Sequence, residues 1–126
     1  MLFMANKFKY LTTEEIVLMH DEIIKETGGY AGLISRGNLD FIVSQMQIPQ
    51  DIARKATTLL FGILSSHPFL DGNKRTAIAS VEIFLKRNNK RLEAANQELW
   101  DVVHKVSEGK LKFEEVVNWI KDRIRD

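Results

Sequence analysis

The sequence predicts an all-α protein, a compact bundle of about six helices. Apolar residues recur three and four positions apart through most of the chain, and no convincing run of alternating strand residues interrupts them. Glycine, asparagine and proline stand between the periodic segments, at the positions where helices are expected to end. The chain has 126 residues, of which 44% are hydrophobic, so it can bury a core of its own and we expect a single domain over residues 1–126.

The first expected helix opens at Thr12. This threonine and Glu15, three residues on, form a capping box in which each side chain satisfies a free backbone N–H of the other residue. Apolar residues follow at helical spacing until Gly28, since glycine takes the left-handed conformation of a helix end at little cost. We interpret the segment 28–37 as a loop, with a short hairpin flap as the alternative.

Two more helices are expected before Pro68. Asn38 is expected to cap a short one, and Pro49 to begin a long one, because the fixed φ of proline suits a first helical turn. Pro68 ends the long helix, since the residue before a proline is pushed away from α geometry. The apolar stripe of this helix is typical of a central, buried helix. It consists of Ile52, Ala56, Leu59, Leu60, Ile63 and Leu64.

The last three helices are separated by asparagine and glycine. They are expected to begin near Asn73, with Asn96 as an N-cap, and around Phe113. The asparagine pair at 88–89 and Gly109 end the first two of them, since both residue types occupy left-handed caps readily. The resulting chain of helices has no predicted strand.

Composition excludes several classes of protein. The absence of cysteine excludes disulfides and thiolate metal sites and permits the cytoplasmic location that we expect. The net charge of +1, from 18 basic and 17 acidic residues, is unlike the basic footprint of a nucleic-acid-binding protein. The longest apolar run is far shorter than the ~20 residues of a membrane span, and the N-terminus has no pattern of a secretory signal. We therefore expect neither direct nucleic-acid contact nor a membrane.

The candidate chemistry is concentrated between His67 and Arg75, which read His-Pro-Phe-Leu-Asp-Gly-Asn-Lys-Arg. The following helix directs free backbone N–H groups and the positive end of its dipole into this loop, which makes an anion site. Gly72 lets backbone approach a ligand closely, and Lys74 and Arg75 add charge for phosphate oxygens. Asp71 is a hard oxygen ligand of the kind that Mg²⁺ prefers beside phosphates, and His67 suits a general base near neutral pH.

A phosphate site, a metal ligand and a base together describe transfer from a nucleotide to a hydroxyl group. An ordinary turn is the alternative. Asp71, Gly72 and Asn73 also suit a turn with an asparagine cap, and a lone histidine before proline is more often structural than catalytic. In this alternative, Lys74 and Arg75 are simply solvated side chains with no ligand, although cations in a first helical turn oppose the helix dipole.

The same loop resembles the signature of the Fic/Doc family, His-x-Phe-x-(Asp/Glu)-Gly-Asn-(Gly/Lys)-(Arg/Lys). Lys74 resembles the Doc (death-on-curing) toxin branch, whereas most Fic adenylyltransferases have glycine at that position. The resemblance covers nearly the whole chain. It includes residues 11–21, the glycines at 28, 29 and 32, Phe84-Leu85 before Asn88, and the final helix after Gly109.

The resemblance implies a role for each residue of the loop. The histidine deprotonates the target hydroxyl, Phe69 anchors the loop in the core, and Asp71 associates with Mg²⁺, so Asp71 is the expected metal ligand. ATP and Mg²⁺ are the implied cofactors. The expected catalytic residues are His67, Asp71 and Arg75, and the expected ATP-binding residues are Gly72, Asn73, Lys74 and Arg75.

Members of the Doc branch transfer the γ-phosphate of ATP to a threonine of elongation factor Tu and so arrest translation. Lys74 favours this reaction over AMP transfer, because a glycine would let the α-phosphate settle against backbone. Ile78 favours it too, since many adenylylating members carry a second arginine there. Protein adenylylation and a catalytically inactive fold that only binds a partner remain the alternatives.

The resemblance also implies partners. The segment 28–37 corresponds to the flap that aligns a target protein. Ile34-Ser35 stands where many Doc relatives have an Arg-Asp pair. This difference bears on which target protein is bound more than on which reaction is catalysed. No (Ser/Thr)-x-x-x-Glu-(Gly/Asn) inhibitory segment is present, so inhibition is expected in trans from an antitoxin protein. His20 is interpreted as a packing residue. The three histidines share no ligand spacing, so zinc is not expected.

Overall fold

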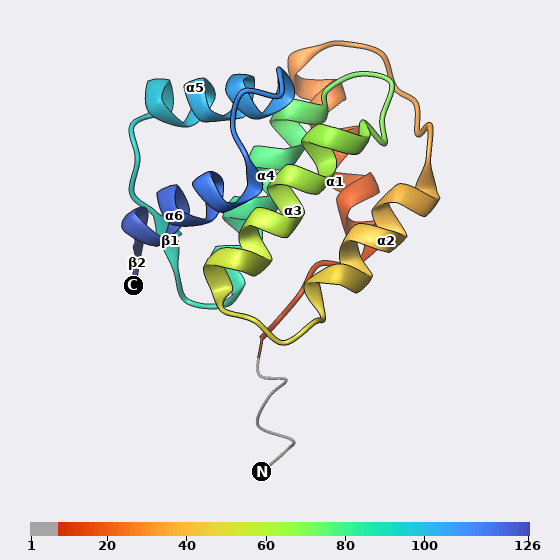
Figure 1. Cartoon of the computed structure of the whole chain (residues 1–126). Coiled ribbons are helices and arrows are strands. Elements are labelled where there is room, and N and C mark those ends of the chain that lie inside the picture. The colour runs from red at the N-terminus through yellow and green to blue at the C-terminus, as the bar shows by residue number, and fades with distance from the viewer. Residues whose placement is uncertain (1–7) are drawn as a thin grey trace.

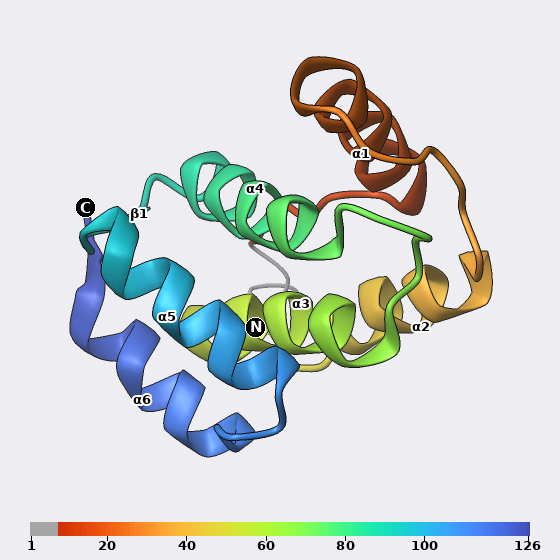
Figure 2. The same ribbon diagram turned by 90° about the horizontal axis from the view of Figure 1, so that it is seen from above.

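The computed structural model describes residues 8–126 and has six helices in this range (Figures 1 and 2). The elements are α1 (Thr13–Thr27), α2 (Arg36–Met46), α3 (Ile52–Ser66), α4 (Asn73–Arg87), β1 (Arg91–Leu92), α5 (Asn96–Ser107), α6 (Phe113–Arg123) and β2 (Ile124–Arg125). Helix α3 is central: it packs most extensively against α4, α2, α6 and α5, and Figure 2 shows it between α2 on one flank, α6 and α5 on the other, and α4 along its length. The expected all-α bundle is confirmed.

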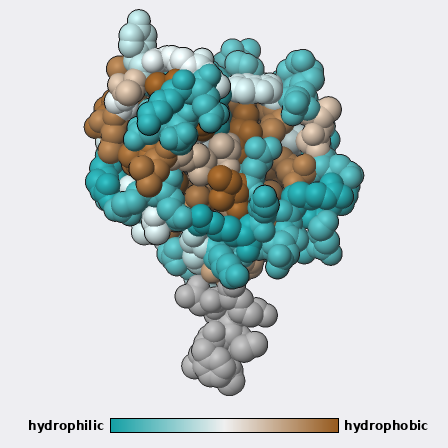
Figure 3. All heavy atoms as spheres, turned by 180° about the vertical axis from the view of Figure 1, so that it is seen from behind, coloured by the Kyte–Doolittle hydropathy of each residue, from teal (hydrophilic) through white to brown (hydrophobic). Residues whose placement is uncertain are grey.

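The apolar stripe predicted for the long helix forms the centre of the core. Leu59 and Ile63 of α3 are fully buried, as are Phe84 of α4 and Ile120 of α6. Figure 3 shows the face turned away in Figure 1, where hydrophilic side chains cover much of the surface with apolar patches between them. None of the described helices has the length and apolar character that a membrane span requires. Residues 1–7, on which the expected absence of a secretory signal rests, lie outside the described residues.

Three helix starts differ from their predictions. Ser35, rather than Asn38, caps α2, and its hydroxyl accepts the N–H of Asn38 at 3.1 Å. Helix α3 begins at Ile52 rather than at Pro49, because Asp51 caps it by accepting the N–H of Arg54 at 2.9 Å. Helix α5 has Ala95 at its N-cap, and Asn96 is already its first helical residue. The capping box of Thr12 and Glu15 and the end of α1 at Gly28 are confirmed.

Two segments pair in ways that the sequence did not indicate. The strands β1 and β2 form an antiparallel pair of two residues each, which ties the end of the chain to the segment after α4. Strands this short carry too few residues to show alternation. The short hairpin considered for 28–37 is not what forms there. Its Leu33 instead forms an isolated antiparallel bridge with Phe69, in the loop between α3 and α4 that carries the candidate catalytic residues and that we call the catalytic loop (residues 67–72). The glycines at 28, 29 and 32 have positive φ.

Lys55 of α3 is buried, with 2% of its surface exposed. Its ammonium group donates to the carbonyl oxygens of Met46 at 2.5 Å and Ile48 at 2.9 Å, at the end of α2. Met46 belongs to the last turn of α2, whose carbonyls have no partner within the helix, and a cation at a helix C-terminus is favoured by the dipole. Lys55 therefore joins the end of α2 to α3.

A salt bridge between Glu15 and Arg87 joins α1 to α4. The two guanidinium nitrogens donate to the two carboxylate oxygens at 3.0 and 2.5 Å. These hydrogen bonds, with that from the N–H of Thr12, lower the pKa of Glu15 from 4.5 to about 2. Because the pKa of Glu15 is lower in the folded state than in the unfolded state, the pair stabilises the fold at pH values above the unfolded-state pKa of 4.5. This contribution is lost as the pH falls from about 4.5 towards the folded-state pKa of about 2.

Glu15→Gln is expected to lower the free energy of unfolding by about 1 kcal/mol at neutral pH, after allowance for screening, since both side chains are more than a third exposed. The difference from wild type should shrink through the acid range and be small near pH 2. Urea unfolding at a series of pH values measures it. Glu22→Gln, at an exposed position of the same helix, should change stability by less than ~0.5 kcal/mol. A difference between wild type and Glu15→Gln that did not vary with pH would contradict the assignment.

Candidate active site

The loop between α3 and α4 begins at a residue with strained backbone. His67 is the C-cap of α3 and lies in the left-handed region, with φ 48° and ψ 63°, while its N–H donates to the carbonyl of Ile63 at 3.1 Å. Non-glycine residues adopt this conformation where the surrounding structure imposes it, here just before Pro68. The result is an exposed imidazole at the end of a buried helix.

Phe69 and Asn73 fix the shape of the loop. The phenyl ring of Phe69 is 1% exposed, which confirms its expected place in the core. The Asn73 amide oxygen accepts the N–H of Phe69 at 3.1 Å, and the amide nitrogen donates to the Phe69 carbonyl at 2.9 Å. The side chain of Asn73 is thus engaged by the loop itself, so its contribution to an anion site would come from its backbone N–H.

The carboxylate of Asp71 accepts one backbone N–H on each oxygen. Tyr30 donates to Oδ2 at 3.1 Å and Gly72 donates to Oδ1 at 2.8 Å. These two hydrogen bonds, that from Tyr30 first, lower the pKa of Asp71 below its ordinary value. An ionised carboxylate has further lone pairs on each oxygen, and the side chain is 40% exposed. Asp71 is therefore an available oxygen ligand at neutral pH.

The first turn of helix α4 presents free backbone N–H groups to the loop. Gly72 is its N-cap in the left-handed conformation, no side chain of the described residues caps it, and its first turn has no acidic residue. Lys74 and Arg75 lie in that turn, beside the free N–H groups. The guanidinium group of Arg75 donates to the Thr27 hydroxyl and to the Gly28 carbonyl, the latter at 3.2 Å. Charge and N–H groups together suit a phosphate.

One cavity of about 280 Å³ brings the predicted site residues together. The structure therefore gathers every residue named as catalytic or ATP-binding, while the roles of these residues stay predictions. Trp100 and Ser107 of α5 also line the cavity, and the sequence did not indicate either of them as a site residue. The position of Trp100 beside the cavity depends on how α5 packs against α3, and the spacing of residues along the sequence does not indicate that packing. The lining residues are Leu64, His67, Leu70, Asp71, Gly72, Asn73, Lys74, Arg75, Trp100 and Ser107.

The expected flap, residues 28–37, overlaps the start of α2, and the part before that helix, residues 28–35, is what we call the flap from here on. It runs beside the catalytic loop. The N–H of Leu70 donates to the Gly32 carbonyl at 2.9 Å, and the N–H of Ile34 donates to the Pro68 carbonyl at 2.7 Å. Gly29 is required where the flap approaches Asp71, because a Cβ atom there would lie 2.6 Å from Asp71 Oδ2. Four large apolar side chains stay exposed on the two segments. They are Tyr30, Leu33, Ile34 and Leu70.

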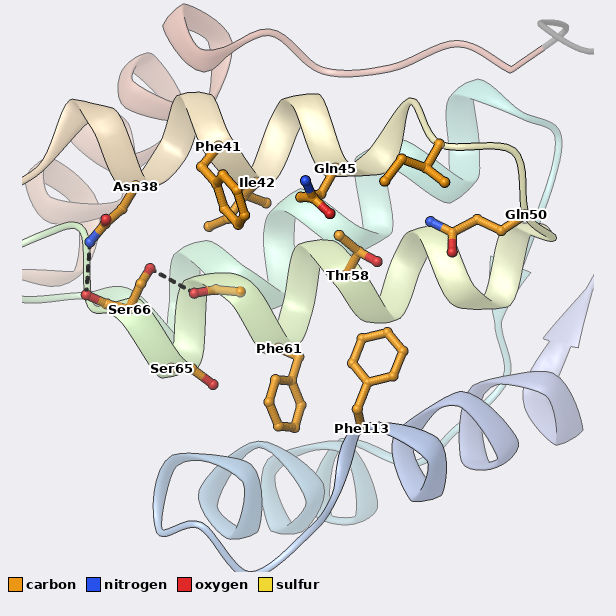
Figure 4. A pocket seen from close by; sticks show the side chains of 12 residues that line it. Asn38, Phe41, Ile42, Gln45, Gln50, Thr58, Phe61, Ser65, Ser66 and Phe113 are labelled. Carbon is orange, nitrogen blue, oxygen red and sulfur yellow. Dashed lines mark hydrogen bonds between the residues drawn. The ribbon is translucent and has the colours of Figure 1, made fainter.

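A second, larger cavity of about 420 Å³ lies between α2, α3 and the start of α6 (Figure 4). Its walls include Phe41, Phe61 and Phe113, and none of its lining side chains is charged. The hydrogen bond from Asn38 to the Ser66 carbonyl, 3.3 Å long, lies at its end nearest the catalytic loop. Phosphate chemistry therefore fits the smaller, charged cavity and not this one.

The donor set around the charged cavity fits a divalent cation bound together with a nucleotide. No three histidine, aspartate or glutamate residues of the described chain come close enough to hold a metal by themselves. Mg²⁺ is commonly held by one or two carboxylates, with water and substrate phosphates completing the shell. Asp71, beside the positive end of α4, supplies such a carboxylate.

Comparisons with known proteins agree with this geometry. A sequence model described as the Fic/DOC family matches residues 10–85, a range that includes the flap, the catalytic loop and α4 up to Leu85. Among curated proteins, the chain is similar to "Protein kinase doc" of Escherichia phage P1. The two are 27% identical over 119 residues, which cover 90% of this chain and 94% of the phage protein. The match therefore spans nearly the full length of both.

Proposed function

This chain belongs to the Fic/DOC family, and from that premise we propose that it is a Doc-like toxin that transfers the γ-phosphate of ATP to a hydroxyl group of a protein. One observation carries the proposal: an exposed histidine, a carboxylate and two cations line a single cavity at the uncapped N-terminus of α4. The similarity to the phage protein kinase supports the class of reaction.

In the proposed reaction, the target hydroxyl oxygen attacks the γ-phosphorus, the bond to the bridging oxygen breaks, and ADP leaves. His67 accepts the hydroxyl proton, since its imidazole is exposed at the rim of the cavity. The free N–H groups of α4, with Lys74 and Arg75, bind the phosphate oxygens and stabilise the negative charge spread over them. Asp71 would hold Mg²⁺, which supplies neutralisation of phosphate charge when it is bound.

A protein is the proposed substrate because of the surface beside the cavity. The exposed side chains of Tyr30, Ile34 and Leu70 extend the apolar surface along the flap, as at sites where proteins dock. The flap and catalytic loop already pair through backbone hydrogen bonds. By resemblance to Doc, the target is a threonine of elongation factor Tu in the cytoplasm, and an antitoxin protein inhibits the enzyme in trans.

Transfer of phosphate is favoured over transfer of AMP by two residues of α4. Lys74 lines the cavity with a long side chain where glycine would leave room for an α-phosphate against the backbone. Ile78, at the position of a second arginine in many adenylylating relatives, packs against the core and adds no charge. Neither residue fixes the orientation of ATP, so isotopic labelling is the direct test.

The test incubates purified protein with elongation factor Tu and Mg-ATP labelled at either the α- or the γ-phosphate. We expect a labelled target band from γ-label alone. A band from α-label would instead identify an adenylyltransferase. No band with either label, in this reaction or with a whole-cell lysate, would contradict an active transferase and leave partner binding as the function.

Lys74→Ala is expected to weaken Mg-ATP binding and to slow γ-phosphate transfer together, because the ammonium group binds phosphate oxygens as a point charge. Lys74→Gly should do the same and gain a trace of AMP transfer, since it also removes the steric bar to an α-phosphate. Calorimetric titration of Mg-ATP and the two-label assay measure these effects. Lys86→Ala, on the exposed face of the same helix, should leave both unchanged. Wild-type binding and γ-transfer in both Lys74 variants would contradict a phosphate-binding role.

A further inference from the structure

His20 of α1 is buried against the back of the catalytic loop, with 1% of its surface exposed. Its ring stacks on Phe69, with 3.8 Å between ring centroids and 5° between ring planes. Its Nε2 atom lies 2.7 Å from the backbone carbonyl oxygen of Asp71. One side chain from a different helix therefore touches both the core anchor of the loop and the peptide that carries the carboxylate.

The hydrogen bond has a defined direction. A carbonyl oxygen only accepts, so the proton must be on Nε2, and His20 is the donor. The other ring nitrogen, Nδ1, lies 3.9 Å from Asp21 Oδ1, which is too far for a hydrogen bond. The Asp71 carbonyl is thus held by His20, while the Asp71 carboxylate is held by the N–H groups of Tyr30 and Gly72.

The peptide that His20 holds leads directly into the phosphate-binding turn. Gly72, the next residue, is the left-handed N-cap of α4 with φ 78°, and a Cβ atom placed there would lie 3.4 Å from His20 Nε2. Rotation of the Asp71–Gly72 peptide would redirect both the carboxylate and the first free N–H groups of α4. His20 donates to the oxygen of this peptide while its ring is held by stacking on Phe69, so it opposes that rotation.

We infer that His20 is a positioning residue for the transfer reaction: through its Nε2–H it fixes the Asp71 peptide, and thereby aims the carboxylate and the N-terminus of α4 at the phosphates. The inference rests on the proposed function for its kinetic consequences. It goes beyond the packing role expected for a helical histidine. Its two contacts, stacking and donation, can be separated by substitution.

Two variants make the separation. His20→Phe keeps an aromatic ring against Phe69 but has no donor, whereas His20→Gln places an N–H near the position of Nε2 but has no ring. We expect His20→Phe to lower kcat by about 10- to 100-fold, the range seen when an outer hydrogen bond to a ligand residue is lost, with KM for elongation factor Tu within about 3-fold. His20→Gln should keep kcat within about 5-fold of wild type even if its Tm falls.

Hydrogen–deuterium exchange of the nucleotide-free protein provides a readout that needs no activity. In His20→Phe, the hydrogen-bonded amides of the loop should exchange at least about 10-fold faster, while those of α6 keep wild-type rates; the loop amides are those of Phe69, Leu70, Gly72 and Thr76. His20→Gln should protect both segments as wild type does. If His20 only fills space, the Phe variant would retain kcat and loop protection, and the Gln variant would lose both; either result overturns the inference.

The outcomes distinguish this inference from the proposed function. If the wild-type protein transfers neither label, the proposed function fails, and the exchange experiment alone decides whether His20 holds the loop. If His20→Phe does not fold, His20→Gln decides: kcat within about 5-fold and a protected loop support donation, and a larger loss overturns it. Circular dichroism and Tm of each variant establish which case applies.

Discussion

His67→Ala is expected to reduce phosphate transfer by about 10²–10⁴-fold while Mg-ATP binding stays within a few-fold of wild type. A positioned general base contributes a factor of this size, and it need not contact the bound nucleotide. The structure supports separate effects on transfer and on nucleotide binding, because the imidazole is exposed at the rim of the cavity and the candidate phosphate-binding groups belong to the next helix. Single-turnover transfer of γ-label and calorimetric titration of Mg-ATP measure the two quantities independently.

The backbone of His67 requires a second variant as control. Its φ of 48° is costly for alanine, so His67→Ala could lose activity through a distorted loop. Asparagine tolerates the left-handed region and is not a base near neutral pH, so His67→Asn should keep the wild-type Tm and show the same loss of transfer. Turnover near the wild-type rate in the asparagine variant would mean that the base has been assigned to the wrong residue.

Much of this fold could be predicted because it depends on local pattern. Apolar spacing located the six helices, and the capping box at Thr12 and Glu15 has the sequence signature of its geometry. Helix starts were less secure where several cap-forming residues stand close together. Ser35 and Asn38 both suit an N-cap, and only the packing of the first turn of α2 against Ser66 decides between them.

The candidate site likewise has a part that the sequence predicts and a part that it does not. Its loop was identified because one continuous segment carries the base, the carboxylate and the cations. The parts supplied by other helices were not, since contacts across 51 positions, such as that between His20 and Asp71, leave no periodicity. The sequence also placed Asn73 among the phosphate binders, and only the structure shows that its amide is engaged by the backbone of Phe69.

Phe69→Ala is expected to lower the free energy of unfolding by about 3–5 kcal/mol, as for other buried phenylalanines. For a chain of 126 residues this corresponds to a fall in Tm of about 10–20 °C. The loss combines a cavity behind the catalytic loop with removal of the ring on which His20 stacks. The loop should also lose its backbone register against Leu33, so transfer should fall even at temperatures where the variant is folded.

Phe41→Ala is the matched control, because it removes the same atoms from a side chain that is 63% exposed on α2. It should shift Tm by no more than ~2 °C, as for most surface substitutions. Differential scanning calorimetry of both variants, with transfer measured at 15 °C, separates stability from chemistry. An unchanged Tm with lost activity in Phe69→Ala would show that this ring shapes the loop without anchoring it. Equal losses of Tm in the two variants would show that burial of Phe69 in the core does not set the cost of its removal.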